Sequence, residues 1–298
     1  MKRNIYSKLW MIFFVLMGAA CTNQVEDAIP VSGQPIEFFV QSDWKEIPNT
    51  RSNDGKTKFE KGNQIQIFGF HRSSSGVKKF MYRVNEPTRG QIVTFDGTNW
   101  NYSPKRFWPK KDTLDFYASY PEYSVLNEGD KMTYEQTVNP LQLDLLWGLA
   151  TNRDCATVRK KPVQIWMVHA LARVDISFHS SLGKIKQAIV SAYKTGSFQR
   201  ANGGVPDWKV DDKTDIKDTI SPYENQQTIG DATVFILPKK ITGLKLILTN
   251  GKEIDASEEI KKHKFDAGKR YKLTISKGVQ KKNTNSRSIA MSVRCVSE

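Results

Sequence analysis

The segments Val163-Gln164-Ile165-Trp166-Met167-Val168 and Ala172-Arg173-Val174-Asp175-Ile176-Ser177-Phe178 decide the fold class of this chain. In both segments apolar residues recur at every second position, which is the period of a β-strand with one buried face. The same period, or a short apolar run, recurs along almost the whole sequence. Helical periodicity is scarce, and its best candidate is residues 141–150. The sequence therefore predicts an all-β protein.

Further strands are expected at residues 36–40, 64–70, 91–95, 100–102, 113–120, 185–190, 232–237, 244–249, 270–276 and 289–296. Turn signals such as Asp96-Gly97 and Asn250-Gly251 separate them. This pattern favours sandwiches over a single barrel. Because residues 179–183 interrupt two strands, we expect an N-terminal β-sandwich over residues 34–178 and a C-terminal one over 179–276, followed by a tail, 277–298.

The first 21 residues have the form of a bacterial lipoprotein signal. Positive charges precede an apolar run, residues 9–16, and three small residues lead to Cys21. Such a run is too short to cross a bilayer, which needs about 20 apolar residues, but it suits a signal peptide. We predict a signal peptide at 1–20, a lipidated (palmitate-bearing) Cys21 and a polar tether at 21–33. Gly18 stands where an aliphatic residue is usual, so ordinary secretion with an incidental Cys21 and a cytosolic protein remain alternatives.

The chain is basic overall, but its positive residues do not gather in one part of the sequence. Residues 1–20 hold three positive charges and no acidic residue, so without them the formal net charge falls from +14 to +11. The remaining positive residues are scattered, mostly in pairs at the edges of apolar runs, and no nucleic-acid-binding motif accompanies them. We expect no nucleic-acid partner. Cys155 and Cys295 are left after Cys21, and the sequence allows them to be either paired or free.

No pattern of catalytic or metal-binding residues is present. The sequence lacks Gly-x-Ser-x-Gly, His-Glu-x-x-His and a phosphate-binding glycine loop. His169 has no metal-like spacing to the other histidines. We therefore expect a protein that is not an enzyme and has no cofactor and no metal.

Several segments in order resemble the fimbrillin family of Bacteroidetes. They are Thr50-Arg51 with residues 59–68, the aromatic segments 100–102, 107–109 and 114–121, residues 144–150 with 163–174, and in the second half 195–198, Trp208, 235–238 and 265–271. The resemblance implies two transthyretin-like β-sandwich domains in tandem and export to the outer membrane. In polymerising members it implies a protease cut after an arginine that removes the first strand, so that the exposed groove accepts a strand from a neighbouring subunit. The aromatic segments are interpreted as core-filling, with a glycan-binding platform as the alternative.

Three sets of candidate residues follow. Arg51 is the candidate for proteolytic maturation, with an uncut, solvated arginine as the alternative. Ile289, Met291 and Val293 alternate as a donor strand would, although the same segment could be the last strand of its own C-terminal domain. Thr113 and Thr219 stand in Asp-Thr-aliphatic triplets that resemble the O-glycosylation pattern of this bacterial group.

The sequence thus predicts a lipid-anchored fimbrial (pilus) structural or accessory subunit that assembles by strand exchange and contributes to adhesion. Its expected location is the surface of the cell outer membrane, or the fimbrium once polymerised. The expected partners are other fimbrial subunits, the outer membrane and a ligand on a host or bacterial surface. The alternative is a monomeric surface lipoprotein that binds a glycan or a host ligand.

Overall fold

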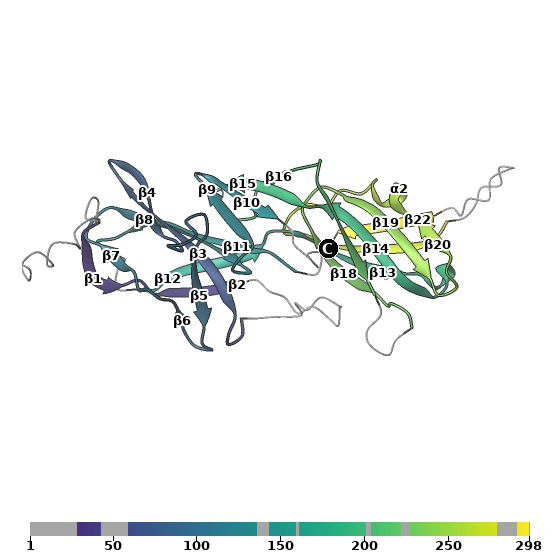
Figure 1. Cartoon of the computed structure of the whole chain (residues 1–298), viewed down its shortest axis with the longest axis horizontal. Helices are drawn as coiled ribbons and strands as arrows, with labels where there is room; N and C mark the ends of the chain where they lie inside the picture. Colours follow the sequence, from purple (N-terminus) through teal and green to yellow (C-terminus); the bar gives the residue numbers. More distant parts are fainter. Residues whose placement is uncertain are drawn as a thin grey trace, which may run out of the picture.

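The computed structural model describes residues 29–42, 59–135, 143–158, 161–200, 204–221, 227–278 and 291–297. Figure 1 shows an elongated molecule whose N-terminal and C-terminal halves lie end to end along the longest axis. Strands make up nearly all of its regular structure, and the described helices are the short α2 (Ser257–Ile260) and the 3₁₀ turn η2 (Ser180–Leu182). The all-β prediction is confirmed.

The N-terminal half is built on an eight-stranded sheet in the order β2-β12-β11-β8-β3-β5-β6, with β4 paired to β3. Its strands are β2 (Phe38–Ser42), β3 (Gln64–Ser73), β4 (Gly76–Met81), β5 (Gln91–Phe95), β6 (Trp100–Asn101), β8 (Thr113–Tyr120), β11 (Leu146–Asp154) and β12 (Val163–His169). A separate pair joins β1 (Val31–Pro35) to β7 (Phe107–Pro109), so residues 31–33 of the predicted tether belong to a strand. One face of the large sheet buries an apolar cluster that includes Ile65, Trp108 and Phe116.

The C-terminal half packs two four-stranded sheets against each other. One has the order β18-β13-β21-β22 and the other β17-β14-β19-β20. Their strands are β13 (Ala172–Phe178), β14 (Ile185–Tyr193), β17 (Asp215–Ile220), β18 (Ala232–Ile236), β19 (Ile241–Leu248), β20 (Glu253–Asp255), β21 (Arg270–Lys277) and β22 (Met291–Ser297). Alternate residues of these strands, such as Val174, Val190, Leu246 and Leu273, fill one continuous core between the two layers.

A third core joins the halves. The sheet β16-β15-β10-β9 covers the second face of the large sheet, with strands β9 (Val125–Glu128), β10 (Lys131–Glu135), β15 (Thr195–Gln199) and β16 (Lys209–Val210). Strand β15 follows directly on β14 of the C-terminal half, yet it pairs with β10 over five residues. Phe198 of β15 lies between Trp147 and Trp208, with ring centroids 4.9 and 4.8 Å away. Both halves therefore contribute to this junction core.

Strand pairing differs from the expected boundary at residue 178. β13 hydrogen-bonds β18 and β21, so it lies with the strands of the C-terminal half. The chain crosses between the halves earlier, at Ala170 and Leu171, whose side chains are buried in the junction core. The interruption at 179–183 is the turn η2, which stays within the C-terminal half. The tandem of transthyretin-like domains stays a prediction.

The helical candidate at residues 141–150 was wrong over its described part. Residues 143–145 have no regular structure, and β11 begins at Leu146. Leu146 faces the core of the N-terminal half whereas Trp147 faces the junction core, so the strand is apolar on both sides. Cys155 is buried in the N-terminal half and Cys295 lies on β22, and these two cysteines do not form a disulfide.

Arg200 fixes the end of β15 at the junction. Its guanidinium lies 3.8 Å from the ring centroid of Phe70 and donates to the carbonyl of Gly129 at 2.8 Å. It also pairs with Asp130, but that carboxylate is 80% exposed, so the ion pair contributes little. The stacking and the carbonyl bond are the stronger contributions, because the arginine itself is 8% exposed.

We predict that Arg200→Met lowers the free energy of unfolding by about 1–3 kcal/mol, because it removes a charge-assisted hydrogen bond and a cation–π contact. Urea denaturation followed by tryptophan fluorescence measures this, since Trp147 and Trp208 lie in the same core. The control is Lys262→Met, which removes only an exposed ion pair and is expected to change stability by less than about 0.5 kcal/mol. Equal effects of the two substitutions would contradict the conclusion that Arg200 stabilises the junction through its stacking and its bond to the carbonyl of Gly129.

Asp175 gives the C-terminal half a defined response to acid. Burial alone would raise the pKa of this carboxyl, but hydrogen bonds from Thr233, Arg270 and Arg173, at 2.5, 2.7 and 3.0 Å, outweigh it and the pKa is lowered. A carboxyl with a lowered folded-state pKa stabilises the fold above its unfolded pKa, near 3.8. That contribution is lost as pH falls through the folded-state pKa.

Thr233→Val is therefore expected to cost about 1–3 kcal/mol at pH 7, because it removes a hydrogen bond to a charged group. The deficit should shrink once Asp175 is protonated, well below pH 3.8. Urea midpoints at pH 7 and at the lowest pH where the chain is still folded measure the change. Thr219→Val, an exposed threonine on β17, is the control. A deficit that does not depend on pH would show that Thr233 acts through packing alone.

Candidate functional site

The edge strand β2 is the most informative part of the N-terminal half. It pairs with β12 alone among the described strands, and the pairing is parallel, from Val163↔Phe38 to Met167↔Ser42. Phe38 and Val40 point into the core and are each 6% exposed, whereas Phe39 is 48% exposed. A two-residue alternation thus inserts two apolar side chains of an edge strand into the core.

The residues before β2 are held from both sides. The fully buried Ile36 donates its backbone N–H to the carbonyl of Arg106 at 2.9 Å and accepts the hydroxyl of Tyr102 at 2.8 Å. Burial raises the pKa of Tyr102 to about 12, so this phenol stays a hydrogen-bond donor at neutral pH. On the other side, the N–H of Val163 donates to the carbonyl of Glu37 at 2.7 Å.

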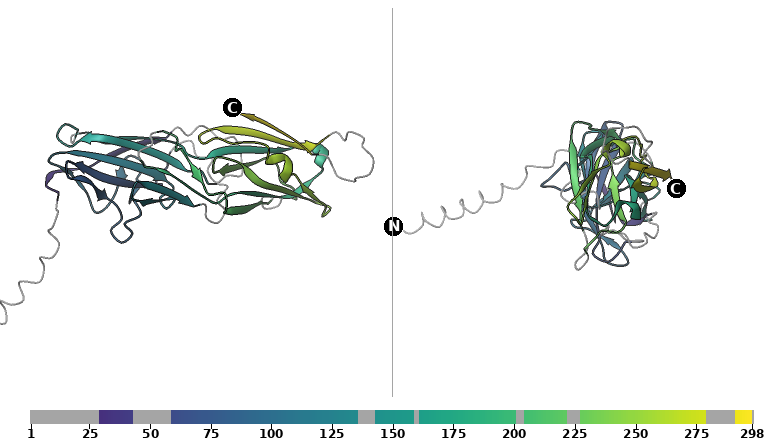
Figure 2. Two further views of the ribbon diagram at one scale, coloured as in Figure 1. Left: turned by 90° about the horizontal axis from the view of Figure 1, so that it is seen from above. Right: turned by 90° about the vertical axis from the view of Figure 1, so that its right-hand side faces the viewer.

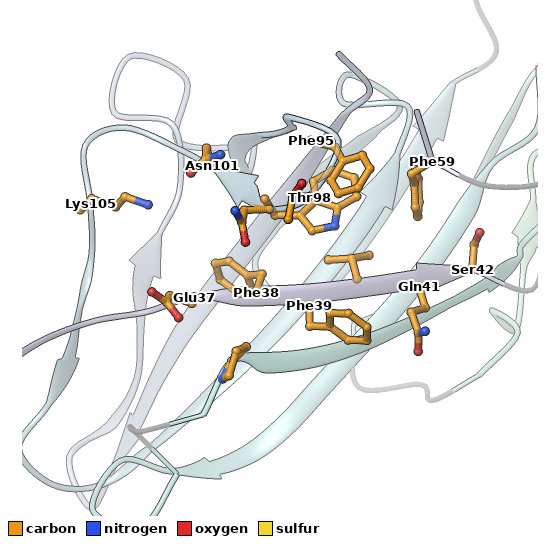
Figure 3. Close-up of a pocket in the computed structure, with 14 residues that line it drawn as sticks. Glu37, Phe38, Phe39, Gln41, Ser42, Phe59, Phe95, Thr98, Asn101 and Lys105 are labelled. Atoms are coloured by element: carbon orange, nitrogen blue, oxygen red, sulfur yellow. The ribbon is translucent and has the colours of Figure 1, made fainter. Parts of the chain in front are cut away.

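A pocket of about 670 Å³ lies beside β2, between this strand and the turn that joins β5 to β6. Figure 3 shows Phe38 on β2 pointing to the side on which Phe59, Phe95 and Thr98 lie, whereas Phe39 points to the other side of the strand. The lining residues are 37–42, Phe59, Phe95, 98–101, Lys105 and Pro162. The ring of Trp100 lies 5.0 Å from those of Phe59 and Phe95, so the pocket has an aromatic wall.

The opposite rim of the pocket is fixed by Asp96. Its carboxylate accepts the backbone N–H groups of Thr98 and Asn99 at 2.8 and 2.7 Å, and the side-chain amide of Asn101 at 2.7 Å. These hydrogen bonds, first of all the one from Asn99, lower the pKa of Asp96. At neutral pH the carboxylate is therefore charged and holds the turn in one shape.

The candidate donor segment is a strand of its own chain in this structure. β22 pairs antiparallel with β21, from Lys277↔Met291 to Tyr271↔Ser297. Val293 and Cys295 are partly buried against the C-terminal core, and burial raises the pKa of the Cys295 thiol. Figure 2 shows β22 in yellow at the edge of the C-terminal half. This is the arrangement of a retained last strand, and β22 is an edge strand like β2.

The other candidate residues lie apart from the pocket or outside the described residues. Thr113, half-buried, is the first residue of β8, and the exposed Thr219 lies on β17 in the other half, so their glycosylation stays a prediction. Cys21, Arg51 and Ile289 fall outside the described residues, as does the signal peptide.

Most of the aromatic residues in the aromatic segments of the sequence are buried, although Phe107 is 38% exposed. Trp108, Phe116 and Tyr117 are at most 2% exposed, which confirms the core-filling interpretation for these three residues. Within the described ranges no three His, Cys, Asp or Glu residues are grouped to hold a metal ion, and no helix has the length and apolarity to cross a membrane. His169 instead pairs with Asp144 beside the junction core.

Sequence reasoning missed the pocket, because its two walls come from segments far apart in the chain. The one signal available was the pair of Asp96-Gly97 and Trp100, a tight turn followed by a large aromatic residue. The strand at 36–40 was expected, but the sequence carries no sign that its partner is β12 or that the pairing is parallel.

Comparison with known proteins places the chain in a family. The model of the family described as fimbrillin-like matches residues 50–290. No curated protein matches the chain. Among solved structures, a candidate cell adhesion protein of Bacteroides uniformis is 17% identical with a TM-score of 0.54, covering 89% of this chain and 97% of that one. A second candidate cell adhesion protein, from Bacteroides ovatus, is 14% identical with a TM-score of 0.51 and coverages of 88% and 96%.

At these identities the two structures show a shared fold and nothing further. The family model, by contrast, spans most of the sequence and includes the strands from β3 to β21. The chain therefore belongs to the fimbrillin-like family.

Proposed function

We propose that this protein is a lipid-anchored structural or accessory subunit of a fimbrium, which joins other subunits by strand exchange and contributes to adhesion. The observation that carries the proposal is the position of β2. It is an edge strand with two side chains in the core, and it precedes Arg51 in the sequence. Family membership supports a fimbrial or adhesin role.

A cut after Arg51 would separate β1 and β2 from the rest of the chain. Loss of β2 would expose the backbone of β12 and leave the places of Phe38 and Val40 in the core empty. Such a slot accepts a foreign strand by β-augmentation, because unpaired N–H and C=O groups gain partners while alternate side chains fill the vacated places.

The parallel pairing of β2 makes replacement favourable. Parallel pairs are slightly less stable per residue than antiparallel ones. An incoming strand that runs antiparallel to β12 would therefore be held better than the strand it replaces. The donor we propose is the segment with Ile289, Met291 and Val293 of a neighbouring subunit. It would have to leave β21 first, and its edge position supports this because it breaks one ladder only.

The lipid on Cys21 would have two different consequences. An uncut chain would stay attached to the outer membrane through residues 21–51, as suits an anchor subunit. A cut chain would lose its lipid and its first strands together and pass into the fimbrium. The alternative function, a monomeric surface lipoprotein that binds a glycan or a host ligand, requires neither the cut nor strand exchange.

The cut is tested by Arg51→Ala in the organism that makes the protein. We expect this variant to keep residues 21–51 and to be absent from SDS-resistant ladders, which the wild-type chain should form with Ser52 as its first residue. Lys56→Ala, a nearby positive residue on the other side of the proposed cut, is the control and should assemble normally. Ladders of unchanged intensity with Arg51→Ala would overturn the maturation step.

The donor role is tested by deleting residues 288–298. We expect a folded chain that no longer forms ladders, with its fold checked by circular dichroism. If the deletion prevents folding, Val293→Asp tests the same face, with Arg294→Ala on the exposed face as the control. Normal polymers from a folded chain without the tail would show that the tail is retained.

A further inference from the structure

We propose that the pocket beside β2 binds a neutral oligosaccharide and does so only while β2 is in place. This inference rests on the proposed function, because it names the class of ligand through which the subunit would adhere. It concerns the intact chain and does not need polymerisation.

The aromatic wall supplies one half of the recognition. Trp100, Phe59 and Phe95 form a cluster. The ring centroids of Phe59 and Phe95 each lie 5.0 Å from that of Trp100. Phe59 and Phe95 are partly buried, and both line the pocket with Trp100. A sugar ring has apolar C–H faces that carry a small positive charge, and the face of an aromatic ring is negative. Stacking of the two removes apolar surface from water on both sides.

The rim supplies the other half. Thr98 and Asn99 on the turn, Asn101 on β6 and Ser42 on β2 present hydroxyl and amide groups. Each can both donate and accept hydrogen bonds, as sugar hydroxyls do. Because Asp96 holds the amide N–H of Asn101, the carbonyl oxygen of that side chain is left to accept. The turn is fixed before a ligand arrives, which reduces the entropy cost of binding.

The charge of the pocket selects a neutral ligand. Glu37 and Lys105 are the charged residues that line it, and their charges are opposite. The ammonium of Lys105 lies 4.7 Å from the ring centroid of Tyr102. Because the charges of Glu37 and Lys105 offset each other, the lining has no net charge that would favour an anionic or a cationic ligand. Its volume, about 670 Å³, lies in the range of roughly 300–1,000 Å³ for sites that enclose small ligands.

An extended peptide is the competing ligand, since β2 has a free edge. A strand bonded to both β2 and β6 would hold these two strands about 9.5 Å apart, twice the ordinary spacing. Residues of β2 and β6 approach within 8 Å between Cα atoms, so a strand cannot run through between them. The space between β2 and β6 therefore suits a small ligand bound by side chains better than an extended peptide strand.

β2 supplies much of the pocket wall, through residues 38–42, and Glu37 directly before the strand adds to it. Removing this strand by the proposed cut would open the pocket on that side. The uncut, anchored subunit would therefore bind the oligosaccharide and a cut subunit would not.

The test titrates the purified full chain, in detergent, with maltohexaose, mannopentaose and chitohexaose by calorimetry and tryptophan fluorescence. We expect saturable binding of at least one. Asn99→Ala and Thr98→Ala should each weaken that binding about 3- to 10-fold, as expected for one lost hydrogen bond. The control is Gln164→Ala, an exposed amide on the adjacent β12 that does not line the pocket. Chain cut after Arg51 and freed of residues 21–51 should not bind.

Two results would overturn the inference. One is that none of the three sugars binds, including the case in which only a peptide of residues 288–298 does. The other is that Asn99→Ala and Thr98→Ala bind as the control does. Ladder formation is measured separately, so the two proposals fail separately. Sugar binding without ladders would contradict only the proposal of strand exchange. Ladders without sugar binding would contradict only the proposal of oligosaccharide binding.

Discussion

The packing of Phe198 between Trp147 and Trp208 is the interaction on which the arrangement of the whole chain depends. Phe198 comes from a strand that continues the C-terminal half, and Trp147 from the middle of the large N-terminal sheet. Gly196 lies two residues before Phe198, where a Cβ atom would lie 2.9 Å from the ring of Trp208. Only glycine lets β15 approach so closely. The indole N–H of Trp208 donates to the carbonyl of Ala170 at 2.7 Å and so ties this core to the chain crossing.

The junction leaves the two ends of the molecule free for other roles. In the N-terminal half the order of strands places β2 and β6 at the two edges of one curved sheet, and the pocket forms where these edges approach. In the C-terminal half β22 ends one sheet. The features that could exchange or bind are thus edge features, whereas the strands between them are buried and paired. Backbone groups that could pair with another strand therefore lie on β2 and β22, whereas the strands between the edges are already paired on both sides.

The sequence predicted strands whose apolar residues alternate over a long stretch or form an apolar run, but it missed several short ones, such as β9 and β10. β5, β8 and β13 follow the predicted ranges to the residue, because their apolar residues alternate or form a short run. β4 was missed since most of its residues are exposed, and β15 since Gly196 and Ser197 interrupt the pattern. β11 suggested a helix because a strand buried on both faces loses its two-residue period. The pocket could not be predicted, as it depends on which distant edges of a sheet come together.

The two links between the halves have a mechanical consequence. A single connection at residues 170–171 would act as a hinge, about which the halves could bend. The ladder of β10 with β15 is a second attachment beside it, and its five residue pairs must break before the angle can change. A lateral load on one end would then be resisted by two points instead of one. The elongated molecule in Figure 1 therefore behaves as a stiff lever, which carries a force applied at one end to the other with little bending between.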